Sequence, residues 1–582
     1  MNPTQLLAHF DRISEAPDAV ARLRRFILDL AVRGKLVEQD PSDEPAAELL
    51  KRIQAEKALQ VKGKPLTSVD AVETPFSATA QWVWVRLGEI CSKTGSGSTP
   101  KGGKEAYRSS GIPFLRSQNV HDDGLRLDSV AYIDEETHQR MRGTAICPGD
   151  LLLNITGGSI GRCARVPDNF SGGNISQHVA ILRLAFRELN DFTHLVILSS
   201  GFQNEIFHSQ TGAGREGLPK NRMDEILIPL PPLAEQHRIV AKVDELMTLC
   251  DELAAAQIER EVRRDQLVAA SLNRIGTAPA AAAETVTETQ TATSLHDAAR
   301  FHLNHLPRLT TRPEHIKQLR QTILNLAVRG RLVVQDRGDE PAAELLKQIQ
   351  IGIKLYGQQN RVKPAVTETI GNKTMYFPQP EGWMWARLTE LCKVITDGDH
   401  LPPPKAEVGV AFLTIGNIST GTLNFTNCRY VPQDYFNKIA AYRRPEAGDL
   451  LYTVVGATYG RPALVEKNTP FCVQRHIAIL KPAREVLSKY LLVLLSSPLV
   501  YEQATASLTG TAQPTIPLRP LRNFLVPLPP LAEQHRIVAR VDQLMALCDQ
   551  LETQLTTTQT DSRRLLEAVL RDVLETIAVA TG

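Results

Sequence analysis

A glycine-rich run near residue 100 is the part of the sequence that most resembles a phosphate-binding loop. It extends from Thr94 to Lys104 and reads TGSGSTPKGGK, and backbone N–H groups in glycine turns can bind anions. A nucleotide-binding loop requires G-x-x-x-x-G-K-[ST], but Ser98 stands five residues before Gly103 and Glu105 follows Lys104. The run therefore does not predict a nucleotide site. A plain surface loop and a loop that contacts nucleic-acid phosphates remain as alternatives.

The chain has none of the catalytic motifs NPPY, DPPY and HExxH. Histidines are therefore the other side chains that could do chemistry. His237 and His535 recur in a repeated LAEQHRIVA segment at predicted helix starts, where polar groups are routinely satisfied. We interpret both as packing or capping residues. His178 and His476 adjoin predicted apolar strands, and for them we favour a structural role over a nucleic-acid contact.

Composition excludes several classes of protein. The 582 residues carry a net charge of +2 and eight cysteines without a CxxC pair, so neither a generally basic nucleic-acid-coating protein nor a zinc ribbon or secreted disulfide scaffold is expected. The longest apolar run, Tyr490 to Leu495, is far shorter than a membrane span of about 20 residues, and no basic-then-apolar leader begins the sequence. We expect a cytoplasmic protein with reduced thiols.

The elements that position these residues are predicted by an internal repeat. Residues 229–253 return at 527–551 with four differences in 25 positions, and residues 27–54 return at 323–350 with six differences in 28. Apolar residues spaced three and four apart follow Pro231-Pro232 and predict a helix of about 40 residues with a coiled-coil seam. Each half is therefore a near-constant helical frame that holds one inserted domain of about 150 residues, a common domain size.

This pattern predicts the fold class and the domain boundaries. We expect an α+β chain in which two α/β domains are held apart by long antiparallel helices that form a coiled-coil frame with a pseudo-two-fold repeat. The predicted segments are an N-terminal helical segment (1–80), a first inserted domain (81–230), a central long helix (231–275), a linker (276–294), a second helical segment (295–380), a second inserted domain (381–528) and a C-terminal long helix (529–582).

The twin PLPPLAEQHRIVA(K/R)VD segments, the twin LAVRG(K/R)LV segments and the landmarks GSTPKGG, IPFLRSQNV and GDLLLNITGGSIGR resemble the specificity subunit of type I restriction-modification enzymes. The resemblance covers essentially the whole chain. It implies that the inserted domains are target recognition domains, each of which reads one part of a bipartite, asymmetric site in double-stranded DNA. It further implies a chain without an active site.

The resemblance also implies the partners. The chain would dock two methyltransferase subunits that bind S-adenosylmethionine and, through them, restriction subunits that use ATP and Mg²⁺; no cofactor is expected on this chain itself. Two alternatives remain: a chain that itself carries methyltransferase or nuclease chemistry, and a protein-only helical scaffold. Charge does not decide between them, since residues 81–230 carry 16 basic and 16 acidic residues and 381–528 carry 15 and 11.

Candidate contact residues follow from the positions where the two copies disagree within a matched frame. Arg suits guanine and Gln suits adenine in the major groove. The predicted base-reading residues are Arg116, Ser117, Gln118, Thr414 and Ile415. The predicted DNA-backbone contacts are Lys101, Lys104, Asn119, Arg162, Asn417 and Arg461. The predicted partner-docking residues on the long helices are Leu233, Val240, Met247, Leu531, Val538 and Met545.

Overall fold

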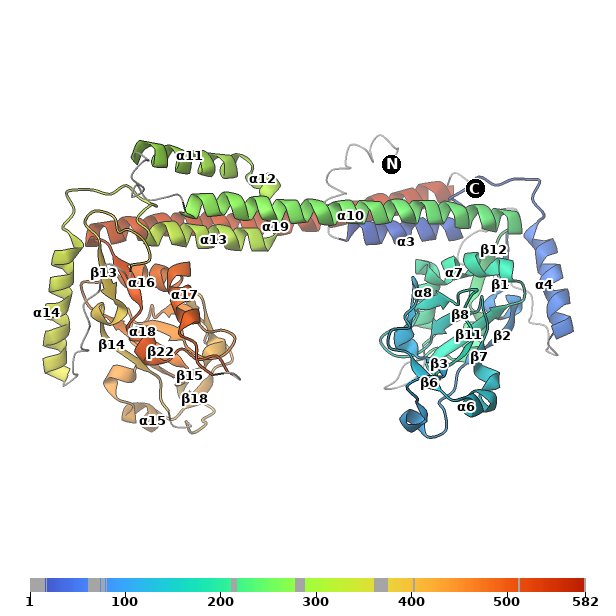
Figure 1. The fold of residues 1–582 in the computed structure, drawn as a ribbon, viewed down its shortest axis with the longest axis horizontal. Helices are drawn as coiled ribbons and strands as arrows, with labels where there is room; N and C mark the ends of the chain where they lie inside the picture. Colours follow the sequence, from blue (N-terminus) through green and yellow to red (C-terminus); the bar gives the residue numbers. More distant parts are fainter. Residues whose placement is uncertain are drawn as a thin grey trace. The chain divides into compact units, whose positions relative to one another are not determined.

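The computed structural model shows a chain of mixed helix and sheet with two repeated domains (Figure 1). It describes residues 16, 18–60, 74, 79, 81–210, 217–277, 288–360, 375–400, 403–510 and 513–579. The chain divides into two compact units. The first unit comprises residues 1–259 and 559–582, and the second comprises residues 260–558.

The inserted domain of the first unit is built on two four-stranded sheets. The antiparallel sheet has the order β2 (Cys91–Ser96), β11 (Val179–Leu184), β8 (Leu151–Asn154), β9 (Cys163–Arg165). The mixed sheet has the order β6 (Ala131–Ile133), β3 (Ile112–Leu115), β10 (Gly173–Ile175), β7 (Ala145–Ile146), and its β3 and β10 run parallel.

The strand β8 shows how the sequence forms the core. All four of its residues are buried, and the first three are leucines without polar alternation, followed by the buried Asn154. Because successive side chains point to opposite faces, Leu151 and Leu153 enter the large cluster that includes α7 (Asn190–Leu198) and the long helix, whereas Leu152 enters the cluster between the two sheets.

The second unit repeats this plan with one strand fewer. Its antiparallel sheet has the order β14 (Cys392–Asp397), β22 (Ile477–Pro482), β19 (Leu450–Thr453), β20 (Pro462–Leu464). Its other sheet has the order β18 (Arg429–Val431), β15 (Val410–Leu413), β21 (Phe471–Val473), and β15 and β21 run parallel.

Each inserted domain begins and ends at one place on the helices. In the first unit β1 (Val83–Arg86) pairs antiparallel with β12 (Leu227–Leu230), which leads directly into α10 (Leu233–Thr277). In the second unit β13 (Met384–Arg387) pairs in the same way with β23 (Leu525–Leu528), which leads into α19 (Leu531–Val579).

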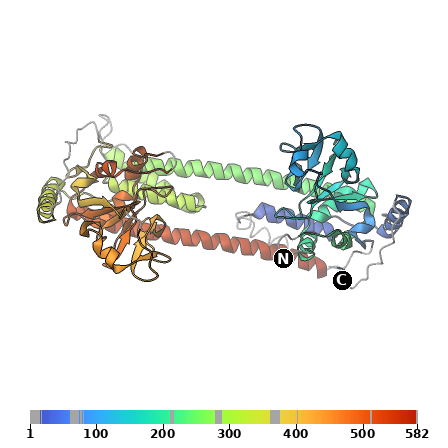
Figure 2. The same ribbon diagram turned by 90° about the horizontal axis from the view of Figure 1, so that it is seen from below.

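The shorter helices also recur. The first unit has α3 (Ala19–Val32) and α4 (Ala46–Gln60), and the second has α13 (Pro313–Val328) and α14 (Ala342–Asn360). In the first unit α7 and α8 (Ser200–His208) contact α3. Figure 2 shows the end of α19 beside α3, where Arg22 and Glu567 form an ion pair of 2.7 Å.

One prediction about the connection between the halves is wrong. Residues 276–294 were expected to be a linker because they lack large apolar residues, but α10 continues to Thr277 and a further helix, α11 (Glu288–Asn304), begins inside the segment. The intervening residues 278–287 lie outside the described part of the chain. The apolar side of helix α11 packs on α10, and Ala298 of α11 shares one buried cluster with Val268 of α10.

Two structural findings bear on the class of protein. Within the described ranges, no helix is long and apolar enough to cross a membrane. Within the same ranges, no group of three or more His, Cys, Asp or Glu side chains could hold a metal ion.

Candidate nucleic-acid interface

Four loops of the first recognition domain meet at one edge of its sheets. Because β3 and β10 are parallel, the residues that follow them leave the sheet on the same side, and Ser176 N–H donates to the Leu115 carbonyl at 2.9 Å. The ends of β2 and β8 also lie beside the start of their antiparallel partner β11. We call residues 97–104, 116–119, 155–162 and 176–178 the first loop edge.

The second recognition domain has an equivalent edge. Gln474 N–H donates to the Leu413 carbonyl at 3.0 Å, again across a parallel pair of strands. Val454 N–H donates to the His476 carbonyl at 3.0 Å, as Ile155 N–H does to His178 in the first domain. We call residues 398–400, 414–417, 454–461 and 474–476 the second loop edge. Both edges thus share one backbone arrangement.

The predicted base-reading residues of the first edge differ in their exposure and in their contacts. Gln118 is exposed, and its amide has no partner among the described residues. Arg116 is half-buried, lies over the Tyr107 ring at 5.8 Å and donates to the Ser129 carbonyl at 3.4 Å. Ser117 is half-buried and its carbonyl accepts from the Asn154 amide at 2.9 Å. Gln118 is therefore the freest of the three side chains.

Two predicted base-reading residues of the second edge are engaged internally. The Thr414 hydroxyl donates to Asn417 Oδ1 at 3.0 Å. Ile415 is half-buried and packs on the apolar cluster between the sheets. In the turn that follows β15, Ile415 thus packs toward the core and the Thr414 hydroxyl closes the turn, and their assignment as base readers stays a prediction.

The predicted backbone contacts Asn119 and Asn417 are structural residues. Asn119 is 0% exposed; its Oδ1 accepts from Arg116 N–H at 3.0 Å and its amide donates to the Arg126 carbonyl at 2.8 Å. Asn417 makes the matching bonds to Thr414 N–H at 2.9 Å and to the Asn424 carbonyl at 3.1 Å. Both amides close a turn and are not available to phosphates.

Three of the four predicted cationic contacts lie at the surface. Lys101, Arg162 and Arg461 are exposed, and among the described residues the two guanidinium groups have no ion-pair partner. The side chain of Lys104 lies outside the described part of the structure. Lys101, Arg162 and Arg461 therefore remain candidates for phosphate contacts.

A search of protein families identifies the chain. The model of the type I restriction modification DNA specificity domain matches residues 80–264 and 380–558, one match for each recognition domain. The chain belongs to this specificity-domain family. It is 30% identical to the specificity subunits of the type I restriction enzymes EcoAI and EcoEI of Escherichia coli, over 94% of this chain and 93% of each relative.

Two solved structures are also similar. A chain from a study of complex assembly and conformational transition of the type I R-M system shares 22% identity, with a TM-score of 0.45, over 86% of this chain and 98% of that chain. The HsdS subunit of Thermoanaerobacter tengcongensis shares 22% identity with a TM-score of 0.38 over the same shares.

The predicted docking residues of this family member pack inside their own units. Val538 is buried, Leu233, Val240 and Met247 pack against the core of the first unit, and Met545 packs against that of the second. Leu531 is 39% exposed. The three-four spacing marks the packed seam of each helix, and the partner-docking role of these helices stays a prediction. The exposed leucines at matching positions are Leu249 and Leu547.

The fold places the four repeated histidines in two different environments. His237 and His535 are exposed, which contradicts a packing role, and the capping alternative stays a prediction. His178 is half-buried, and its Nδ1 is 2.6 Å from the Thr156 hydroxyl. His476 is half-buried beside Arg475, and burial together with this arginine lowers the pKa of His476. These two histidines belong to the loop edges.

A G-x-S-x-G pattern, Gly157 to Gly161, was missed in the sequence, although this pattern is typical of serine hydrolases. In such enzymes the serine stands on a turn from a strand to a helix. Here Ser159 lies in the turn between the antiparallel strands β8 and β9 and contacts the amide of Asn154 at 3.2 Å. The setting is that of a hairpin turn at the first loop edge.

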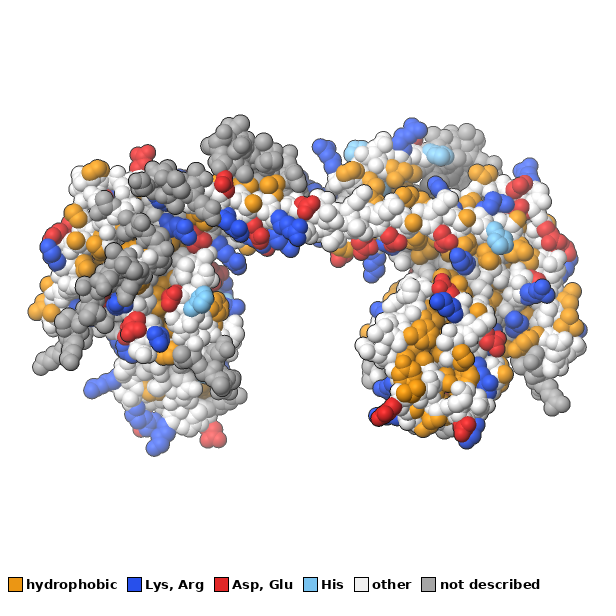
Figure 3. Space-filling view, turned by 180° about the vertical axis from the view of Figure 1, so that it is seen from behind, with side chains coloured by type: hydrophobic (Ala, Val, Ile, Leu, Met, Phe, Trp, Pro, Cys, Tyr) orange, Lys and Arg blue, Asp and Glu red, His pale blue; other side chains and the backbone are white. Residues whose placement is uncertain are grey.

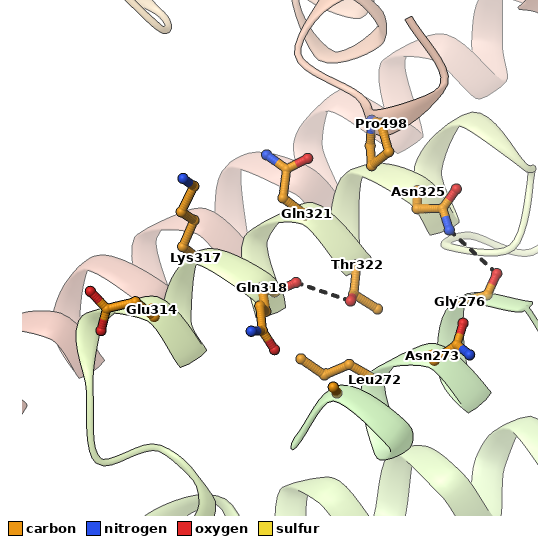
Figure 4. A pocket seen from close by; sticks show the side chains of 11 residues that line it. Leu272, Asn273, Gly276, Glu314, Lys317, Gln318, Gln321, Thr322, Asn325 and Pro498 are labelled. Carbon is orange, nitrogen blue, oxygen red and sulfur yellow. Dashed lines mark hydrogen bonds between the residues drawn. The ribbon is translucent and has the colours of Figure 1, made fainter. Parts of the chain in front are cut away.

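A pocket of about 540 Å³ lies on the helices of the second unit, between the end of α10, α13 and Pro498 (Figure 4). Its lining residues Ala269 and Gln318 stand where the repeat has Glu567 and Arg22, which form an ion pair in the first unit. The pocket thus lies where the two copies differ, and it contains no residue of a loop edge.

Charge by itself does not mark the interface. On the face of the molecule that Figure 3 shows, Lys and Arg side chains are interspersed with Asp and Glu over each unit. The loop edges are identified instead by strand topology and by the exposed side chains that differ between them. One such pair, Gln177 and Arg475, was missed, although comparison of the two copies beside His178 and His476 could have found it.

Proposed function

We propose that the chain reads a bipartite, asymmetric DNA sequence, with one loop edge for each part. The observation that carries this proposal is that the two edges have the same backbone arrangement but different exposed side chains. Gln177 stands where the second edge has Arg475, and Gln118 stands where it has Gly416. Side chains of these types discriminate between bases in the major groove, so each edge selects its own sequence.

The long helices supply the spacing in this proposal. Helices α10 and α19 are 45 and 49 residues long, and at 1.5 Å per residue each is about 70 Å long, more than the roughly 34 Å of one DNA turn. In this proposal they act as the frame that sets the distance between the recognition domains. A frame of fixed length sets a fixed gap between the two parts of the target.

The partners of this function supply the chemistry. We infer that the chain is a non-catalytic, cytoplasmic subunit that docks two methyltransferase subunits with S-adenosylmethionine and, through them, restriction subunits that use ATP and Mg²⁺. The exposed Leu249 and Leu547, which are 52% and 53% exposed at matching positions of the repeat, support two equivalent contacts. The hairpin setting of Ser159 supports a recognition role for its loop.

Methylation mapping tests the function. The chain is produced with its methyltransferase subunit in a host that lacks other adenine methylation, and the modified adenines are located across the genome. A single bipartite, asymmetric motif is expected. Modified sites without a common motif would favour a protein-only scaffold, and S-adenosylmethionine binding by the isolated chain would favour the alternative in which it is itself the methyltransferase.

A further inference from the structure

The turn between β10 and β11 carries one exposed side chain, Gln177, at its tip. Its neighbours Ser176 and Val179 are buried, and His178 is half-buried. The turn is closed by a hydrogen bond from Val179 N–H to the Ser176 carbonyl at 3.0 Å. Gln177 is thus the one exposed residue of this turn, and its side chain lies at the surface of the first loop edge.

The second loop edge presents Arg475 in the same way. Ile477 N–H donates to the Gln474 carbonyl at 3.0 Å and closes an equivalent turn between β21 and β22. Arg475 is exposed at its tip, with Gln474 and His476 half-buried on either side. The two side chains therefore occupy one structural position in the two domains.

A glycine holds each turn in place from the neighbouring loop. A Cβ atom on Gly97 would lie 2.1 Å from the Ile175 carbonyl oxygen, and one on Gly398 would lie 2.1 Å from that of Val473. Any side chain at this position would force the loop away from the turn. Only glycine therefore allows the backbone of the loop to cross the turn in direct contact. Both turns are therefore held in register with the loop that follows the first strand of the antiparallel sheet.

Both tip side chains are oriented by a neighbour. The Thr99 hydroxyl donates to Gln177 Oε1 at 3.0 Å, and the Gln177 amide nitrogen has no partner among the described residues. Arg475 Nε donates to His476 Nε2 at 3.3 Å, and within the described ranges its two terminal nitrogens have no partner. The Thr99 hydroxyl uses one of the two lone pairs of Gln177 Oε1, so the second lone pair and the amide N–H groups of Gln177 can still meet a base edge. Arg475 is held at Nε, and its two terminal nitrogens can do the same.

We infer that Gln177 and Arg475 are the equivalent base-reading residues of the two domains, with Gln177 directed to an adenine of one half-site and Arg475 to a guanine of the other. The inference rests on the proposed function and adds residue identity to it. A glutamine amide matches N6 and N7 of adenine, and two guanidinium nitrogens match O6 and N7 of guanine. Thr99 and His476 are positioning residues in this arrangement.

Exchange of the tips tests the inference in the complete chain with its methyltransferase partner. Arg475→Gln is expected to alter one base position of the second half-site and to weaken binding of the original site by about 5- to 150-fold. Gln177→Arg is expected to alter one position of the first half-site only. Arg484→Gln is the matched control, because Arg484 is exposed beyond the opposite end of β22.

The outcomes separate the inference from the function on which it rests. If the unaltered complex methylates a bipartite motif and both tip variants keep that motif and its affinity, the inference is overturned while the proposed function stands. An equal loss of binding to all DNA sequences would also overturn it, because it would show a phosphate contact. Absence of any sequence preference in the unaltered complex would overturn the proposed function itself. Circular dichroism of each variant identifies a folding defect. If Arg475→Gln has such a defect, Arg475→Lys is the second variant. It keeps the charge but not the two-pronged geometry, and it is expected to lose the preference for guanine.

Discussion

The indole N–H of Trp82 donates to Glu235 Oε2 at 2.9 Å, and both side chains are buried. Trp383 and Glu533 repeat the contact at 2.9 Å in the second unit. In each case a tryptophan just before the recognition domain is joined to the first turn of the helix that follows the domain. The bond therefore fixes both ends of the domain to the helical frame.

Loss of this donor should destabilise the second unit. Trp383→Phe removes the N–H that serves the buried Glu533 carboxylate, and an unsatisfied buried group costs about 1–3 kcal/mol. Trp385→Phe is the control, because Trp385 is also buried and its N–H has no hydrogen-bond partner among the described residues. Urea unfolding should show the larger loss for Trp383→Phe. Equal losses would mean that ring volume, and not the hydrogen bond, determines the effect.

The same carboxyls predict a pH dependence of stability. Burial raises the pKa of Glu235 and of Glu533, so the folded protein keeps these protons at pH values where the unfolded chain, with a pKa of about 4.3, has lost them. Their contribution to the free energy of unfolding is complete below the unfolded pKa and is lost as pH rises through the folded pKa.

The double variant Glu235→Gln, Glu533→Gln does not titrate at these positions. Relative to it, the unaltered chain should be most stable at about pH 4 and should lose this advantage as the pH rises toward neutrality. Urea unfolding of both proteins across this range measures the difference. An advantage of the unaltered chain that grows with increasing pH would contradict the raised pKa of the two carboxyls.

The repeat explains how much of this architecture the sequence could predict. Two matched segments and the apolar spacing after Pro231-Pro232 were sufficient for two repeated domains and two long helices, because periodic packing is written in the local sequence. The parallel pairing of β3 with β10 was not predictable in this way. It joins strands far apart in the chain, and it is this pairing that brings the four loops of an edge together.

The site was harder to predict because differences between the copies do not show which way a side chain points. Asn119 was selected as a surface residue, but the turn after β3 needs its amide to join Arg116 and Arg126. Ile415 was selected because it differs from its counterpart Ser117, but its side chain packs on the cluster between the sheets. Exposure, which only the fold supplies, distinguishes Gln177 and Arg475 from these residues.

The structural role of Asn119 can be tested directly. Asn119→Ala leaves Arg116 N–H and the Arg126 carbonyl without their side-chain partner, at a cost of about 1–3 kcal/mol in the free energy of unfolding. The slope of log affinity against log salt for DNA binding should not change, because no phosphate contact is lost. A shallower salt slope with unchanged stability would show that Asn119 contacts the DNA backbone.

Arg162 and Arg461 should show the opposite behaviour. Neutralisation of either by glutamine is expected to weaken binding to all DNA sequences alike and to reduce the salt slope by about 1. Arg165→Gln is the matched control, since Arg165 is paired with Asp168 at 3.0 Å and is three residues from Arg162. Fluorescence anisotropy at several salt concentrations measures the slope. A loss confined to one base position would identify a base reader instead of a phosphate contact.

The last prediction concerns a half-chain of residues 1 to about 275, which contains one recognition domain and one copy of each helical element. In the complete chain the end of α19 covers α3, with Leu566 and Val569 buried. A half-chain lacks this segment, and the repeat offers residues 261–275 of a second copy in its place. An isologous dimer is therefore expected, since it covers the exposed apolar seam.

Both recognition domains of that dimer would be the first one, so the methylated motif should become an inverted repeat of the first half-site. The Arg22–Glu567 ion pair is lost, because the repeat has Ala269 in place of Glu567. Ala269→Glu in the half-chain should restore it and strengthen the dimer by about 0.2–1 kcal/mol. Analytical ultracentrifugation measures the association, and methylation mapping with the methyltransferase partner reads the motif. A strictly monomeric half-chain, or a motif that still contains the second half-site, would refute the pseudo-two-fold relationship between the copies.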